Sequence, residues 1–447
     1  MRAGPIDDAP AAAAWLEGLL DVEKRPDLPY ARLGLDPVRQ LLARLGDPQR
    51  DLSVIHIAGS KGKGSTALFA ESLLRAAGQR VGTFTSPHLE RWTERFRIDG
   101  EEVPGSDLAA AVRRLRPEVE LLRARDPSRA PTFFDATTAA ALWLFREARV
   151  DRVVLEVGLG GRLDSTNAVL PAVTCITTIE LEHTDKLGDT LEQIAGEKAG
   201  ILKPGVPAVG GALPEPARRV VEARAREVGA PLAWLGADFQ CEILAADLSG
   251  LRLVLRDGPL ELEAQVPVLG AHQAANAALA LACVRRAGVS DAVLAATAPG
   301  GLASVRLPGR AELLSRAPWI LVDAAHTGAS ARALARVIER FPRRHAHFVL
   351  SISAGKDLDA ILDALLPGAN EVTVTRAQPT RSQDPAAIAA AVRRAAPGLM
   401  LRVVPNPHLA LRAAAEALAP DHLLCATGSV YLAGIARGVL AGNRVDL

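Results

Sequence analysis

The sequence predicts an α/β protein with mainly parallel sheets, built as two domains. Apolar runs of strand length alternate with helical patterns rich in Ala, Leu and Arg along almost the whole chain, which is typical of α/β architecture. A glycine-rich turn joins one strand to one helix near residue 60, as in proteins that bind nucleotide phosphates. A cluster of Pro and Gly between residues 299 and 309 separates two such alternating regions.

The composition indicates a globular protein of 447 residues, 49% of them hydrophobic. That length favours about two or three domains. The 52 basic and 51 acidic residues leave a formal charge of +1, which does not point to nucleic acid or a membrane surface as a partner. No apolar run approaches the roughly 18 residues of a spanning helix. The acidic N-terminal segment is typical of an amphipathic helix rather than a signal peptide. Four cysteines without CxxC spacing predict reduced thiols in a cytoplasmic protein.

The expected strands and helices alternate in order along the chain. Strands are expected at Val54–Ile57, Val153–Val157, Val173–Ile179, Ile320–Val322, His347–Ser351, Val372–Val374 and Leu423–Ala426. Helices are expected at Asp107–Arg125, Ala136–Arg146, Pro216–Val228 and Ala329–Glu339. Residues 239–266 differ, because two alternating runs flank Asp257-Gly258, which predicts a β-hairpin. We expect the first domain to span residues 1–303 and the second to span residues 304–447.

The segment from Val54 to Thr66 carries the strongest functional signal. Its glycines let backbone N–H groups approach an anion, and the following helix adds the positive end of its dipole. Lys63 is placed to reach terminal phosphates, and a hydroxyl of Ser65 or Thr66 is placed to bind Mg²⁺. The strict phosphate-loop pattern needs a hydroxyl residue directly after the lysine, whereas Gly64 stands there. The pattern predicts binding of ATP or GTP, with an ordinary glycine-rich turn as the alternative.

Polar residues after other strands extend this candidate site. Glu156 ends an apolar strand, where a carboxylate near a phosphate loop is placed to hold Mg²⁺; the alternative is an ion pair. His183 lies among three acids after the run ending at Ile179, with a solvated loop histidine as the alternative. Lys198 follows closely enough to reach the same cleft, or is a solvated helix end.

Further candidates lie toward the C-terminus. Asn276 offers the paired donor and acceptor that adenine needs, or is a surface amide. Asp323 and His326 follow a strand of the second domain. Arg310, at the domain junction, is suited to clamp a phosphate, or forms an interdomain ion pair.

Together these segments resemble the folylpolyglutamate synthase/dihydrofolate synthase family, relatives of the Mur ligases. The resemblance runs in order from about residue 27 to about residue 437. It is carried by Gly59–Thr66, Ser86–Leu89, Glu94–Ile98, Phe134–Thr138, Leu155–Asn167, His183–Asp185, Glu197–Ile201, Pro308–Arg310, Asp323–His326 and Thr427–Leu432.

The resemblance implies a P-loop Mur-ligase-like ATPase domain with a parallel central sheet and a smaller Rossmann-like C-terminal domain. The implied reaction is the ATP-dependent addition of L-glutamate to a folate or dihydropteroate carboxylate through an acyl phosphate. It implies a monomer that uses ATP and Mg²⁺, with a monovalent cation and a carbamylated Lys198 as further features. Implied catalytic residues are Lys63, Lys198, His183 and Arg310. Implied nucleotide contacts are Gly59, Gly62, Lys63, Gly64, Ser65, Thr66, Asn276, Arg310, Asp323 and His326. Implied metal ligands are Ser86, Glu156 and His183, and implied folate contacts are Phe134, Thr137 and Asp164.

Three departures from the common bacterial pattern bear on the substrate. Ser60-Lys61 stands where many bacterial members have Thr-Asn, Glu182 stands in place of Asp, and Thr327 in place of Asn. Lys61 and Thr327 resemble the eukaryotic folylpolyglutamate synthases, which favours polyglutamylation without excluding dihydrofolate synthesis. A Mur-type ligase for a UDP-sugar acceptor and a nucleotide-binding module without catalysis are the alternatives.

Overall fold

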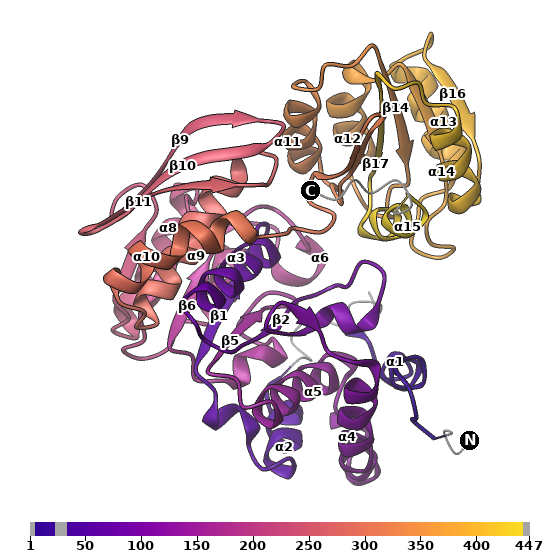
Figure 1. The fold of residues 1–447 in the computed structure, drawn as a ribbon. Helices are drawn as coiled ribbons and strands as arrows, with labels where there is room; N and C mark the ends of the chain where they lie inside the picture. Colours follow the sequence, from indigo (N-terminus) through magenta and orange to yellow (C-terminus); the bar gives the residue numbers. More distant parts are fainter. Residues whose placement is uncertain (1–4, 23–33, 441–447) are drawn as a thin grey trace. The chain divides into compact units, whose positions relative to one another are not determined.

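The computed structural model describes residues 5–22 and 34–440. The start of the resemblance near residue 27 lies outside these residues. The chain forms two compact units: the first comprises residues 1–242, 253–265 and 273–305, and the second comprises residues 243–252, 266–272 and 306–447. Each unit is a sheet covered by helices (Figure 1).

The first unit is built on an eight-stranded sheet in the order β4-β3-β2-β5-β1-β6-β7-β8. Its strands are β1 (Val54–Ala58), β2 (Val81–Phe84), β3 (Phe96–Ile98), β4 (Glu101–Glu102), β5 (Arg152–Glu156), β6 (Val173–Ile176), β7 (Ala208–Gly210) and β8 (Leu232–Trp234). Strands β2, β5, β1, β6, β7 and β8 run parallel, whereas β3 pairs antiparallel with β2 and β4. All five residues of β1 are buried, as expected for a central strand covered on both faces.

Helices cover both faces of this sheet. They are α1 (Ala9–Glu17), α2 (Asp36–Arg44), α3 (Lys63–Ala76), α4 (Gly105–Arg125), α5 (Phe133–Glu147), α6 (Thr184–Leu187), α7 (Leu191–Ala199), α8 (Glu215–Glu227), α9 (His272–Arg286) and α10 (Asp291–Ser304). One core packs Leu41, Phe96 and Phe145 with residues of α4. Another packs Ile176, Ile194 and Val221. Helix α3 packs directly on β1, β2 and β5, whereas α1 packs on α4 and α10 packs on α3.

The second unit contains a six-stranded sheet in the order β12-β13-β17-β14-β15-β16. Its elements are β12 (Glu312–Arg316), β13 (Trp319–Val322), α11 (Gly328–Ile338), β14 (His345–Leu350), α12 (Leu358–Leu365), β15 (Glu371–Val374), α13 (Pro385–Ala395), β16 (Met400–Val403), α14 (Pro407–Glu416), β17 (His422–Thr427) and α15 (Val430–Leu440). Only β12 runs antiparallel to its neighbour among these described strands. The predicted α/β class with mainly parallel sheets is confirmed.

Three local expectations differ from the structure. The run Val173–Ile179 stops being a strand at Ile176, because Thr177 and Thr178 bond to the loop after β1. The expected hairpin is a three-stranded sheet, in which β9 (Phe239–Asp247) joins β10 (Gly250–Asp257) and β11 (Leu260–Val266). The breakers Pro299, Gly300 and Gly301 lie inside α10 rather than in a linker. Close packing of α10 on α3 offsets their low helix propensity.

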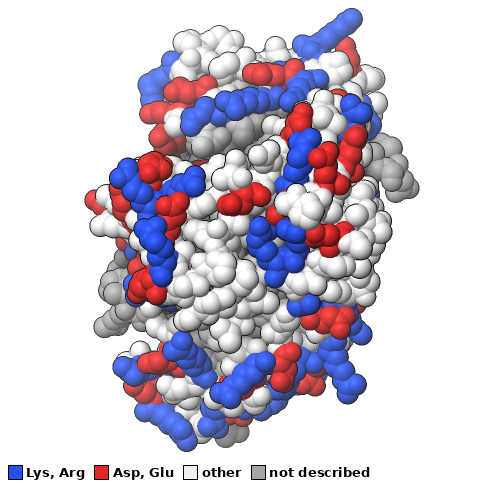
Figure 2. Space-filling model, turned by 90° about the vertical axis from the view of Figure 1, so that its left-hand side faces the viewer, with Lys and Arg blue, Asp and Glu red and all other residues white. Residues whose placement is uncertain are grey.

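No helix in the described ranges is long and apolar enough to cross a membrane. On the face drawn in Figure 2, Lys and Arg lie interspersed with Asp and Glu, without a broad patch of one sign among the described residues. This pattern matches the nearly balanced charge of the sequence.

Candidate active site

The candidate site of the first unit lies at the carboxyl edge of its parallel strands. Strands β2, β5, β1 and β6 are consecutive neighbours and run in one direction. The loops that follow them therefore emerge at one edge, where α/β proteins bind ligands. The sequence candidates lie at these strand ends: Glu156 is the last residue of β5, and Gly59–Thr66, Ser86 and His183 follow β1, β2 and β6.

At two positions of the loop after β1, the backbone has a conformation that glycine alone adopts readily. Gly59 has φ 153° and Gly62 has φ 84°, both in the left-handed range that side chains disfavour. A Cβ atom at Gly59 would overlap Thr177 Oγ1, and one at Gly62 would lie 2.5 Å from Asn276 Oδ1. Gly62 also caps α3, so the loop delivers the chain directly to a helix N-terminus. Unpaired N–H groups and the helix dipole there favour a phosphate.

Two lysines meet at this loop. Lys63 Nζ donates to the Gly59 carbonyl at 3.1 Å, and Lys198 Nζ donates to the same carbonyl at 3.0 Å. Lys198 comes from α7 and is only 5% exposed. Burial first, and then the charge of Lys63, lower the pKa of Lys198 to about 7. Lys198 therefore lies at the phosphate loop, and its catalytic role stays a prediction.

Glu156 and Ser86 adjoin the start of α3. Glu156 is 5% exposed at the end of β5, and its Oε2 accepts the backbone N–H of Ser86 at 2.9 Å. A Cβ atom at Gly64 would lie 3.4 Å from the same oxygen. The glycine after Lys63 therefore leaves room for a carboxylate beside the phosphate loop.

The donor types at this place fit Mg²⁺, which prefers hard oxygen ligands. No group of three or more His, Cys, Asp or Glu side chains suited to a metal ion occurs within residues 5–22 and 34–440. Mg²⁺ is usually held by one or two carboxylates together with substrate phosphates rather than by a closed protein cage. A carboxylate and a hydroxyl residue beside a phosphate loop match that arrangement.

His183 lies at the start of the short helix α6, with φ 53°. Its side chain is about half exposed, and its Nε2 lies 4.0 Å from Glu182 Oε1. The same Glu182 oxygen accepts from Lys61 Nζ at 2.7 Å. The loop after β6 is therefore linked to the loop after β1 through Glu182.

Two threonines that sequence reasoning missed hold the phosphate loop in place. Thr177 Oγ1 donates to the carbonyl of Lys61 at 2.5 Å, and Thr178 Oγ1 accepts the N–H of Lys61 at 2.8 Å. Thr178 also accepts the N–H of Ser60 through its carbonyl at 2.8 Å. The sequence signal for this role is a pair of hydroxyl residues directly after β6. It could be used only by knowing that β6 is a neighbour of β1 in the sheet.

Three nucleotide candidates of the first unit with polar side chains, Ser65, Thr66 and Asn276, are buried. Thr66 is 0% exposed, and its hydroxyl donates to Asn276 Oδ1 at 3.5 Å. Asn276 Nδ2 donates to Gln273 Oε1 at 2.8 Å. Ser65 lies beside Thr66 in the first turn of α3 and is 5% exposed. Asn276 is therefore attached to the phosphate loop rather than lying on the outer face of α9.

The three folate candidates lie in α5 and in the loop after β5. Asp164 is buried, and it accepts the N–H groups of Leu159 at 2.9 Å and Thr166 at 3.0 Å. Thr137 donates to the carbonyl of Phe133 at 2.7 Å, and the Phe134 ring lies 6.0 Å from the ring of Phe84. These contacts give Asp164 and Thr137 local structural roles, and their contact with substrate stays a prediction.

The remaining candidates belong to the second unit. Asp323 follows β13 and accepts the N–H groups of Ala311 at 2.6 Å and Ala325 at 2.7 Å. His326 Nδ1 lies 2.8 Å from the carbonyl of Ala324, and Arg310 donates to the Gly309 carbonyl at 3.1 Å. All three residues surround the carboxyl end of β13, as expected for a strand-end polar site.

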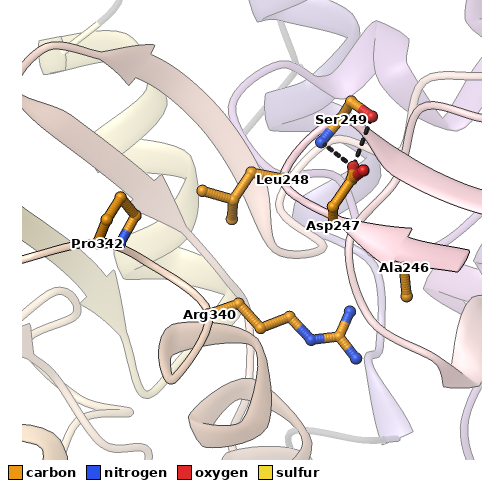
Figure 3. A pocket seen from close by; sticks show the side chains of 6 residues that line it. All are labelled: Ala246, Asp247, Leu248, Ser249, Arg340 and Pro342. Carbon is orange, nitrogen blue, oxygen red and sulfur yellow. Dashed lines mark hydrogen bonds between the residues drawn. The ribbon is translucent and has the colours of Figure 1, made fainter.

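A separate hollow of the second unit contains none of the candidate residues (Figure 3). It is lined by Ala246, Asp247, Leu248, Ser249, Arg340 and Pro342. The carboxylate of Asp247 accepts both the N–H and the hydroxyl of Ser249, at 2.7 and 2.5 Å. This carboxylate therefore stabilises the β9–β10 turn.

Comparison with known proteins assigns both units. Residues 57–284 match the model of the Mur ligase middle domain, and residues 309–430 match that of the Mur ligase glutamate ligase domain. The chain is 35% identical to the dihydrofolate synthase/folylpolyglutamate synthase of Bacillus subtilis, over 79% of this chain and 82% of that protein. It is 34% identical to a probable bifunctional folylpolyglutamate synthase/dihydropteroate synthase of Haloferax volcanii, over 90% of this chain. The chain spans about half the length of that archaeal relative, 48%.

Structural comparison agrees with these matches. A crystal structure of Mycobacterium tuberculosis folylpolyglutamate synthase, complexed with ADP and AMPPCP, superimposes with a TM-score of 0.86 and 34% identity. The superposition covers 98% of this chain and 100% of that one. Both domain matches, the sequence identities and this structural likeness show that the chain belongs to the folylpolyglutamate synthase/dihydrofolate synthase family of Mur ligases.

Proposed function

We propose that this chain is an ATP-dependent ligase that joins L-glutamate to the carboxylate of a folate or of dihydropteroate. The observation that carries the proposal is the glycine-rich loop before α3, where Lys63 and Lys198 share the Gly59 carbonyl beside Glu156. The names of the relatives and the nucleotides in the mycobacterial structure support the choice of reaction.

The reaction joins two anions, so its main physical demand is charge neutralisation. The γ-phosphoryl group of ATP passes to the acceptor carboxylate, giving an acyl phosphate and ADP. The glutamate amine then attacks the acyl carbon; phosphate leaves, and the nitrogen loses a proton as the amide forms. Cations and N–H groups placed where charge develops lower the barrier to each step. Mg²⁺ supplies further neutralisation when bound.

The residues of the first unit take distinct roles in this proposal. Lys63 and the N–H groups at the start of α3 bind the terminal phosphates. Glu156, Ser86 and His183 are the proposed ligands of Mg²⁺, and Asn276 contacts the nucleotide. Arg310, Asp323 and His326 remain proposed nucleotide contacts from the second unit. Phe134, Thr137 and Asp164 remain proposed folate contacts.

Lys198 is proposed to carry a carbamate. Carbamylation requires a neutral amine, and a pKa of about 7 makes that form abundant at neutral pH. The modification converts a cation into an anion able to bind metal. A bound monovalent cation, a monomeric state and a cytoplasmic location complete the proposal.

An acceptor assay tests the function. The purified chain is given ATP, Mg²⁺ and L-glutamate with 7,8-dihydropteroate, with tetrahydrofolate, or with a UDP-linked sugar. Phosphate release is followed, and the amide product is identified by mass spectrometry. Turnover with one or both pterin acceptors is expected. Folded, nucleotide-binding protein that uses neither of them contradicts the proposal, and turnover with the UDP-sugar alone replaces it. Comparison of the two pterins separates dihydrofolate synthesis from polyglutamylation.

A further inference from the structure

An ion pair between Lys61 and Glu182 links the phosphate loop, Gly59–Thr66, to the loop that carries His183. Lys61 Nζ lies 2.7 Å from Glu182 Oε1, with side-chain exposures of 24% and 9%. Glu182 is thus the more buried partner, and a buried carboxylate that loses its cation costs far more than an exposed one. The pair therefore constrains both loops more strongly than a surface ion pair would.

Backbone contacts hold the two loops in register around this pair. The N–H of Glu180 donates to Ser60 Oγ at 2.9 Å, and the N–H of Lys61 donates to Thr178 Oγ1 at 2.8 Å. The backbone contacts set the spacing of the loops near residues 60 and 180. The Lys61–Glu182 ion pair joins the same two loops one residue before His183.

The position of Glu182 gives the pair a consequence for His183. Glu182 Oε1, the oxygen that binds Lys61, also lies 4.0 Å from His183 Nε2. Carboxylates that hydrogen-bond to a metal-binding imidazole fix its ring orientation and tautomer. At 4.0 Å the carboxylate of Glu182 is beyond hydrogen-bond reach and acts on the ring of His183 through its charge. The left-handed backbone of His183, with φ 53°, further restricts where its side chain points.

The pair also organises the charge of the loop. Lys61, Lys63 and Lys198 bring three ammonium groups to this region, and the charges of Lys61, Lys63 and Glu182 all act on Lys198. With Glu182 in place, the ammonium of Lys61 is directed to the carboxylate and not toward Lys63. Loss of Glu182 would free a third cation beside the phosphate loop, where it would compete with a divalent metal ion for phosphate oxygens.

From this geometry we propose that Lys61 and Glu182 act as a positioning pair, which orients His183 and thereby sets the affinity of the nucleotide site for its divalent metal ion. Neither residue is assigned to the chemical step. This inference rests on the proposed function, because it concerns the metal ion of the same nucleotide site.

The test compares Glu182→Gln, Lys61→Met and the double variant K61M/E182Q. Binding of Mn²⁺ is measured by electron paramagnetic resonance with saturating ADP, against a blank of ADP alone. Each single variant is expected to bind Mn²⁺ about tenfold more weakly. The double variant is expected to be no weaker than E182Q, since residues that act as one unit are not additive. In turnover, KM for the nucleotide should rise while kcat at saturating Mg²⁺ stays within about threefold.

A matched control is Glu118→Gln, which breaks the Arg44–Glu118 pair of 2.5 Å between α2 and α4. This variant should leave Mn²⁺ affinity unchanged. Wild-type Mn²⁺ affinity in a folded E182Q protein overturns the inference, as do strictly additive effects of the two single changes. A parallel fall of kcat and thermal stability without a change in Mn²⁺ affinity also overturns it. The Mn²⁺ measurement needs no folate, so failure of the proposed function is recognised separately by wild-type protein that binds Mn²⁺ yet uses no pterin acceptor.

Discussion

Lys63 and Lys198 approach one carbonyl oxygen from different parts of the chain. When both amines are protonated, they raise each other's electrostatic energy, and an anion between them relieves that repulsion. At the scale of single residues, this shared contact is the strongest physical argument for a phosphate site. The helix that begins at Lys63 adds its dipole to the same point.

Replacement of Lys63 by Ala should lower kcat/KM for the nucleotide by about 100-fold or more, because a cation is removed where phosphate charge develops. Steady-state kinetics would measure the loss. The melting temperature should change little, since the lysine bonds only to a loop carbonyl. Lys63→Arg keeps the charge but not the compact ammonium, so it should retain more activity than Lys63→Ala. Unchanged turnover in folded K63A protein would remove this lysine from the site.

Lys198 has a pKa lowered from 10.5 to about 7. The unfolded chain therefore binds more protons than the folded one between these two pH values, so stability should rise with pH across this window and be flat below it. Urea unfolding between pH 6 and pH 9 would measure the slope. Lys198→Met should weaken the dependence, and an unaltered slope in that variant would contradict the assignment.

The same lowered pKa governs carbamylation of Lys198. With ¹³C-bicarbonate, a carbamate signal in the ¹³C spectrum should grow as the pH rises through about 7, because the neutral amine is the reactive form. The signal should be missing from Lys198→Met. A signal of equal strength in that variant, or none in wild-type protein at pH 8, would refute the carbamate.

At the scale of elements, helix α10 illustrates how packing overrides propensity. Gly301 faces α3 so closely that a Cβ atom would lie 3.0 Å from Ala76 Cβ and 3.1 Å from the Ser72 carbonyl. Ser72 Oγ donates to the Gly301 carbonyl at 2.6 Å, which joins the two helices. Gly301 thus lets the two helices approach closely.

Neighbouring glycines of α10 supply a matched pair of variants. Gly300 has open space around its Cβ position, so Gly300→Ala should stabilise the protein by about 0.5–1 kcal/mol through backbone entropy. Gly301→Ala should destabilise it by about 1–3 kcal/mol because α10 and α3 must separate. Chemical denaturation of both variants would check the signs. Equal effects at the two positions would show that close packing of α10 on α3 is unimportant.

The apolar periodicity of the sequence predicted most strands and helices, but it did not predict the order of the strands in each sheet. Adjacent β1, β5 and β6 come from distant segments, 54–58, 152–156 and 173–176. Only the pairing of β1 with β6 explains why Thr177 and Thr178 form hydrogen bonds with the backbone of Lys61. Strand β9, which the sequence did not predict, has no clean alternation of buried and exposed residues, since six of its nine residues are exposed and only one is buried. A half-exposed strand of this kind escapes a period-two search.

At the scale of the whole molecule, one buried histidine in each unit should contribute to the loss of stability in acid. Burial lowers the pKa of His56 to about 3 and that of His347 to about 4. His56 lies in β1 of the first unit, and His347 lies in β14 of the second. Both are therefore neutral in the folded protein at neutral pH and resist protonation.

The folded pKa values lie below the ordinary 6.5, so the unfolded chain takes up protons first as the pH falls. The contribution of each neutral histidine to stability is therefore fully present above pH 6.5 and is lost as the pH falls toward 4. Each histidine should lower the free energy of unfolding by about 1.3 kcal/mol at pH 5.5 relative to pH 7.5. Urea midpoints at the two pH values would measure the loss. His56→Gln and His347→Gln should each reduce the pH dependence, while the exposed His408→Gln should not. Equal pH dependence in all three variants would contradict the prediction.

The sequence by itself determined the α/β class and the glycine-rich loop. It also identified Lys63, Glu156 and His183 as candidate site residues. It could do so because periodicity, turn chemistry and strand-end polar residues are local properties of the chain. Only the tertiary structure decided that Lys198 shares a carbonyl with Lys63, and that Lys61 pairs with Glu182. These facts depend on which strands become neighbours and on how deeply each charge is desolvated, and both are set by contacts between segments more than 100 residues apart.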